Sequence, residues 1–151
     1  MAIAFRRSLL LVPLGCLALG VLASCDNPAG PPPVACSQST VFTGLAQVAP
    51  GIPSVQSFTT TSTGALQVTV DWATEQSVMN LVVAQAPCTL EQLQASSCNV
   101  LTSLWSPPKP MVASTTLLPS GTYVVIVGNP NAVEESIATR VVLSSAGCPV
   151  S

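Results

Sequence analysis

The sequence predicts an all-β fold, an antiparallel β-sandwich of the jelly-roll or immunoglobulin-like kind with about seven or eight strands. Short runs rich in Val, Ile and Thr follow one another from Ser39 onward, and clusters of Gly, Pro, Ser and Asn separate them. Only one short stretch shows a helical pattern. We expect a single domain over residues 36–151, because this length supports one sizeable core and not two.

The clearest strand is expected at Ala65–Trp72 (ALQVTVDW), where apolar and polar residues alternate. A period of two gives one apolar face toward the core and one polar face toward water. Trp72 falls on the apolar face, while Asp71 falls on the outer face beside Gln67 and Thr69.

A second strand, Thr122–Val127 (TYVVIV), is apolar on both faces, which is typical of a central strand. It follows the turn cluster Leu118–Gly121 and ends at the breaker Gly128–Asn131. The remaining strands are expected at Thr40–Val48, Val55–Thr61, Val78–Gln85, Met111–Leu117 and Ser136–Ser144, with an eighth near Asn99–Leu104.

The one helical signal lies between two cysteines, Cys88 and Cys98. Thr89 and Gln92 fit a capping box, in which each side chain bonds the other's backbone N–H, at the start of Leu90–Ala95. We therefore expect one or two helical turns in this loop.

The N-terminal residues 1–24 have the pattern of a signal peptide. Arg6 and Arg7 form a basic start, and Ser8–Val21 is an apolar stretch. About 14 residues at ~1.5 Å per residue reach roughly 21 Å, which is short of the ~30 Å hydrocarbon core of a membrane.

The segment ends in Leu22-Ala23-Ser24-Cys25, which resembles the bacterial lipobox. The resemblance implies cleavage before Cys25, lipid attachment to Cys25, and a membrane-anchored lipoprotein of the bacterial cell envelope that faces the periplasm or the cell exterior. More than one acyl chain makes such anchoring stable. If Cys25 is lipidated, residues 25–35 (CDNPAGPPPVA) form a lipidated, Pro-rich tether. The alternative is an ordinary secretory signal that happens to carry a Cys.

Cysteine use also favours an oxidising compartment. Four cysteines remain beyond the N-terminal segment, and an even number in such a compartment indicates two disulfides, with three possible pairings. We favour Cys36 with Cys148, which brackets the domain, and Cys88 with Cys98, which closes a short loop. A zinc site is disfavoured because the sequence has no C-x-x-C pair and no His.

Composition argues against several function classes. Only 4 Lys and Arg and a net charge of -2 leave no basic surface for nucleic acid. No G-x-S-x-G motif and no His are present, and Lys109 lies between prolines in Ser106–Pro110 (SPPKP), which we expect to be an exposed extended loop. Glu134 and Glu135 are expected to be solvated charges in a loop. We predict no enzyme activity, no metal and no cofactor.

Several segments together resemble one family: GALQVTVDW, MNLVVAQ, the loop with the two cysteines, and LLPSGTYVVIVGNPN. In this order they are similar to the bacterial pre-peptidase C-terminal domain, over roughly Thr43–Ser144. The resemblance implies a small jelly-roll β-sandwich of the kind found on secreted enzymes and lipoproteins. Some members bind calcium through paired Asp residues, whereas this chain has Met79-Asn80-Leu81 at the matching strand.

These observations predict a non-catalytic binding or structural module of the cell envelope, whose partners are the membrane, through its lipid, and an envelope protein or a polysaccharide. The candidate ligand-binding residues are Trp105, Lys109 and Asp71. One alternative is a carbohydrate-binding module that uses exposed aromatic side chains, with Trp105 foremost. A second is a protein-interaction or inhibitor module that uses the loop Ser106–Pro110.

Overall fold

The computed structural model describes residues 36–146 and 148. The predicted signal peptide (residues 1–24), the tether (residues 25–35) and the lipid-attachment residue Cys25 lie outside the described residues. Within the described part of the chain, no helix is long and apolar enough to cross a membrane.

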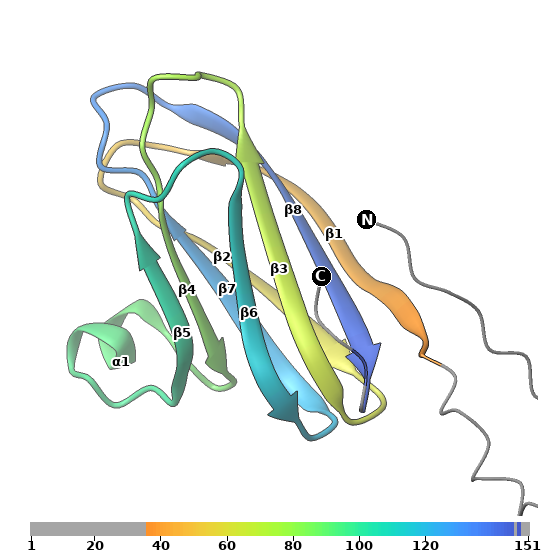
Figure 1. Cartoon of the computed structure of the whole chain (residues 1–151). Coiled ribbons are helices and arrows are strands. Elements are labelled where there is room, and N and C mark those ends of the chain that lie inside the picture. The colour runs from red at the N-terminus through yellow and green to blue at the C-terminus, as the bar shows by residue number, and fades with distance from the viewer. Residues whose placement is uncertain (1–35, 147, 149–151) are drawn as a thin grey trace, which may run out of the picture. The chain divides into compact units, whose positions relative to one another are not determined.

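Eight strands form two antiparallel sheets of four strands each (Figure 1). Sheet A has the order β1-β8-β3-β6, and sheet B has the order β2-β7-β4-β5. The strands are β1 (Gln38–Val48), β2 (Ser54–Thr60), β3 (Gly64–Trp72), β4 (Asn80–Gln85), β5 (Val100–Trp105), β6 (Met111–Leu118), β7 (Gly121–Gly128) and β8 (Glu135–Ser145). This strand order is that of an eight-stranded jelly roll, so the predicted β-sandwich is confirmed.

The core lies between the inner faces of the two sheets. In β3 the predicted alternation holds: Leu66, Val68, Val70 and Trp72 are buried, whereas Asp71 is exposed. Tyr123 of β7 is also buried. Burying this many large apolar side chains supplies the main driving force for folding, at roughly 25 cal/mol per Å².

A second, smaller apolar cluster lies on the outer face of sheet B. The helix α1 (Leu90–Gln94) and its loop cover Val82 and Ala84 of β4 and Ile126 of β7. The predicted Thr89–Gln92 capping box is present. This cover explains why β4 and β7 are apolar on both faces.

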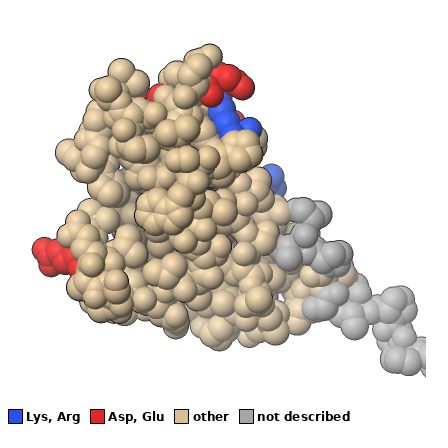
Figure 2. All heavy atoms as spheres, turned by 60° about the vertical axis from the view of Figure 1, so that its left-hand side comes forward, with Lys and Arg blue, Asp and Glu red and all other residues tan. Residues whose placement is uncertain are grey.

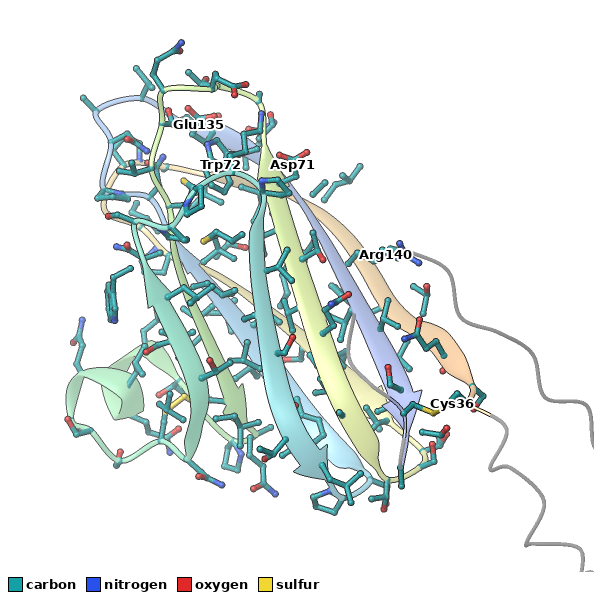
Figure 3. All side chains as sticks on the ribbon, in the orientation of Figure 1. Cys36, Asp71, Trp72, Glu135 and Arg140 are labelled. Carbon is teal, nitrogen blue, oxygen red and sulfur yellow. A yellow bond between two sulfur atoms is a disulfide. The ribbon has the colours of Figure 1, made fainter. Side chains whose placement is uncertain are left out.

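The predicted Cys88–Cys98 disulfide is confirmed and fixes this covering loop to the sheet. The structure also joins Cys36 to Cys148, with a Cα–Cα distance of 5.3 Å. Cys36 lies at one end of the sandwich, and Glu135 lies at the opposite end (Figure 3). We call the end with Glu135 the distal end, since the chain enters the domain at the other.

Strand β4 begins two residues later than predicted. The side chain of Asn131 forms hydrogen bonds with both backbone groups of Val78. Its Oδ1 accepts from the Val78 N–H at 3.1 Å, and its Nδ2 donates to the Val78 carbonyl at 2.7 Å. Because these groups are already bonded, Val78 does not join the sheet, and the strand starts at Asn80.

Candidate functional site

The distal end holds a buried carboxylate. Glu135 is the first residue of β8, and its carboxylate accepts hydrogen bonds from the Ser77 hydroxyl and, at 3.3 Å, from the Thr74 N–H. The prediction of a solvated Glu135 is therefore wrong, since β8 begins at Glu135 and turns its side chain inward, whereas Glu134 is exposed as expected.

Hydrogen bonds favour the ionised form of the Glu135 carboxylate. The Ser77 hydroxyl, then the Thr74 groups and the Lys109 charge, lower the pKa of Glu135, although burial acts in the opposite direction. The indole Nε1 of Trp72 donates to the Ser77 carbonyl at 3.0 Å. Glu135 thus holds the β3–β4 loop in place, and its oxygens are engaged in that structural role.

Lys109 lies against the same loop. Its ammonium nitrogen is 3.6 Å from an Asp71 carboxylate oxygen and 4.0 Å from a Glu75 oxygen, and it donates to the Ala73 carbonyl at 3.5 Å. Ser106, Pro108 and Pro110 are exposed, as expected for this loop, but the Lys109 side chain is only 20% exposed because it lies against the β3–β4 loop. Figure 2 shows acidic and basic atoms side by side at the top of the view, with a separate acidic group at the lower left and a basic group at the right.

Trp105, unlike Lys109, has a largely exposed side chain. It is the last residue of β5 and is 69% exposed. It lines a hollow of about 170 Å³ on the outer face of sheet B, together with Val82, Leu93 and Ile126. The amide of Asn80, which lies opposite Trp105 in the β4–β5 register, is the polar group of this hollow.

The next residue in the chain, Ser106, fixes the position of Trp105. Ser106 has a positive φ of 51°, so the chain turns sharply after β5. The Ser106 N–H then donates to the Asn80 side-chain oxygen at 3.1 Å. This bond fastens the end of β5 to β4, beside the hollow that Trp105 lines.

A second hollow, of about 200 Å³, adjoins the first. It shares Pro53, Asn80 and Gly128 with the Trp105 hollow and extends to Gly51 and Pro130. The two form a groove that reaches from the indole toward the loops of the distal end.

The structure therefore separates the three predicted ligand residues. Asp71 and Lys109 form an ion pair, whereas Trp105 lies on the other sheet. Sequence reasoning missed Asn80, whose only signal was its place at the start of the apolar run Leu81–Ala84. It also missed the hollow on the outer face of sheet A, which is lined in part by Leu45 and Arg140 and measures about 590 Å³.

Among the described residues, no group of three His, Cys, Asp or Glu side chains is arranged to hold a metal ion. The buried carboxylate is bonded to Ser77 and Thr74, and the ammonium group of Lys109 is paired with Asp71. The groove beside Trp105 offers apolar contacts, one aromatic face and one amide. Such a lining suits binding of a ligand by contact and stacking.

No protein-family model matches the chain, and no curated protein matches it. Solved structures do resemble it. The pre-peptidase C-terminal domain of a collagenase from Bacillus anthracis superimposes with a TM-score of 0.50 at 14% sequence identity, covering 66% of this chain and 87% of that domain. The Yersinia pseudotuberculosis-derived mitogen gives a TM-score of 0.49 at 11% identity, covering 77% of this chain and 100% of the mitogen.

At such low identity the likeness concerns the fold alone. The collagenase domain supports the β-sandwich resemblance that the strand and turn segments of the sequence predict. The chain is, in its fold, similar to a pre-peptidase C-terminal domain.

Proposed function

We propose that this protein is a lipid-anchored, non-catalytic binding module of the bacterial cell envelope, and that its ligand binds in the groove beside Trp105. The observation that carries the binding role is the 69% exposed indole at the edge of an apolar hollow. An exposed Trp fastened in place is costly to keep in water and is typical of a contact surface.

The proposed anchor follows from the lipobox-like Leu22-Ala23-Ser24-Cys25. The domain begins at Cys36, which lies at the end of the sandwich opposite the distal loops. A lipid on Cys25 would thus attach the module through residues 26–35 to the end of the sandwich opposite the distal loops.

Intact mass tests the anchor. The protein is purified from its native membrane fraction and weighed with and without reduction and alkylation. We expect a chain that starts at Cys25 and carries acyl chains, with four alkylatable thiols that appear only after reduction. A Cys25→Ser variant serves as the control and should lose the acyl mass. A soluble wild-type product without acyl chains would contradict the proposed anchor.

Carbohydrate is the ligand class that the geometry favours. Sugar rings stack their C–H faces on an exposed indole, and the Asn80 amide lies in the same hollow to bond a hydroxyl. We expect the protein to be depleted from solution by an insoluble envelope polysaccharide, and Trp105→Ala to abolish that depletion.

The matched control is Val100→Ala. Val100 is another exposed apolar residue of β5, but it does not line the hollow. Its variant should bind as the wild type does. Equal loss of binding in both variants, or unchanged binding in Trp105→Ala, would contradict the proposed site.

A protein ligand is the second candidate, because Ser106–Pro110 directly follows Trp105 and Lys109 fastens this loop to the β3–β4 loop. Replacing Pro107 and Pro108 with Ala would then remove a co-purifying envelope protein and leave binding to polysaccharide unchanged. Loss of polysaccharide binding instead would assign the loop to the sugar site.

A further inference from the structure

The outer face of sheet A is unusually poor in charge. Its four strands contain three charged residues, Asp71, Glu135 and Arg140. Glu135 is buried on the inner side, which leaves Asp71 and Arg140 on the outer face (Figure 3). Both line the same shallow hollow of about 590 Å³.

Two large apolar side chains also stand on this face. Leu45 of β1 is 86% exposed, and Val112 of β6 is 47% exposed. Between them the face carries smaller residues, Ala138 on β8 and Thr69 on β3. The result is a low centre flanked by two apolar projections.

The strand register fixes how these residues lie relative to one another. One row across the sheet runs Leu45, Ala138, Asp71, and the next runs Thr43, Arg140, Thr69, Val112. With strands ~4.8 Å apart and ~3.4 Å per residue, the line from Leu45 to Val112 and the line from Asp71 to Arg140 share a midpoint and cross at roughly a right angle.

This arrangement is self-complementary. When a second copy is placed face to face, with a two-fold axis along the Leu45–Val112 line, Asp71 of each copy meets Arg140 of the other. Leu45 and Val112 lie on the axis, so each meets its own counterpart. An isologous interface requires a patch that matches itself in this way.

We infer that the outer face of sheet A binds a second copy of this chain as a two-fold dimer. The charges support this occupant: within the described residues no carboxylate lies within ion-pairing distance of Arg140, whose Nη2 donates to the Thr40 hydroxyl at 3.3 Å. A copy of the same face supplies Asp71, which also pairs with Lys109 of its own chain, as an acid for each Arg140, and it supplies apolar partners for Leu45 and Val112. The proposal is independent of the Trp105 groove, which lies on the other sheet.

Engineered cysteines test the axis directly. The full chain is used, in detergent if it is membrane-bound and in buffer if it is not. With a short bifunctional thiol-reactive cross-linker, Leu45→Cys and Val112→Cys should each give a cross-linked homodimer, because both positions lie on the axis and sheets packed face to face stand ~10 Å apart, too far for a direct disulfide. Leu117→Cys is the control: Leu117 is 55% exposed on β6 but lies far along the strand from the axis.

Intact mass confirms that the two native disulfides are retained in each variant. Dimers from Leu45→Cys and Val112→Cys without Leu117→Cys dimers support the proposal. Equal cross-linking of all three variants overturns it, as does a Leu45→Cys product linked to a different protein.

Charge reversal provides a second, independent test by sedimentation. Arg140→Asp and Asp71→Arg each place like charges opposite one another in a homodimer, so each variant alone should dimerise at least about tenfold more weakly than the wild type. Mixed in equal amounts, the two variants form heterodimers in which both pairs attract, and dimerisation should return. A mixture that stays monomeric while both variants keep a cooperative thermal unfolding transition overturns the proposal, as does a wild-type chain that is monomeric at all concentrations.

Discussion

The carboxylate of Glu135, the first residue of β8, accepts a hydrogen bond from the hydroxyl of Ser77, which lies 58 residues earlier in the β3–β4 loop. This contact joins one strand of sheet A to the loop that crosses between the sheets. We expect acid to act on the distal end through this contact.

Acid is expected to weaken the fold through Glu135. Its folded pKa lies below the ordinary value of 4.5, so the ionised carboxylate stabilises the fold above that pH, and the contribution is lost as the pH falls through the lower folded pKa. Glu135→Gln should reduce this acid dependence and cost about 1–3 kcal/mol at neutral pH. Urea unfolding from pH 3 to pH 7 measures both effects.

The control for this experiment is Glu134→Gln, one residue earlier in the chain and exposed to solvent. Its stability and its acid dependence should match those of the wild type. An identical response of the two variants would show that Ser77 and Glu135 do not couple the loop to the strand.

Gly64 is expected to tolerate no side chain. A Cβ at this position would contact the Ser144 carbonyl oxygen and the Leu143 side chain on the neighbouring strand β8. Gly64→Ala should therefore destabilise the fold by about 1–3 kcal/mol, because β3 and β8 must move apart. At Gly128 the nearest atom, the Asn80 Cβ, is 3.8 Å away, so Gly128→Ala is the control and should change stability little. Thermal unfolding of both variants measures the difference in stability between them.

Removing the Cys88–Cys98 disulfide should loosen the cover of sheet B. The double variant Cys88→Ser and Cys98→Ser is expected to lose about 3 kcal/mol, the chain-entropy value for so short a loop. Because Val82 and Ile126 lie beneath this loop, the variant should also bind more of a fluorescent apolar dye. Stability that falls without a rise in dye binding would mean that α1 keeps its place without the disulfide.

The Tyr123 hydroxyl is expected to ionise at a higher pH than an exposed tyrosine, because its pKa is raised. It is the only tyrosine of the chain, so an absorbance titration reports on this residue alone. Burial raises the pKa of its hydroxyl above 10.0, and stability should therefore fall as the pH rises through that region. Its hydroxyl donates to the Pro119 carbonyl at 2.5 Å, so Tyr123→Phe should cost about 1 kcal/mol at neutral pH. Ionisation at the ordinary pH in the folded protein would contradict its burial.

The strands could be predicted because each has a local signature. The alternation in Ala65–Trp72 and the doubly apolar run Thr122–Val127 both lie inside observed strands. The capping box at Thr89 is equally local. Such patterns depend only on residues that are close together in the sequence, so they can be recognised without knowledge of the tertiary contacts.

The distal contacts could not be predicted, because they join residues far apart in the chain. Asn131 bonds Val78 across 53 residues, and Lys109, in the β5–β6 loop, pairs with Asp71 of β3. No local pattern marks such partners. Trp105 could be singled out because it lies just before a Pro-rich loop, where an exposed aromatic side chain is expected. Asn80, which bonds the next residue, Ser106, lies in a strand and has no such local signal.

The bond between Cys36 and Cys148 has a mechanical consequence. A pull applied at residue 35 and at residue 149 passes from one sulfur atom to the other and does not run through the strands between them. The chain between Cys36 and Cys148, which contains all eight strands, is a loop closed by the disulfide, and the pulling force does not act on it. A protein stretched between a surface and a bound object would keep its sandwich intact under loads that would unravel the same strands in a reduced chain.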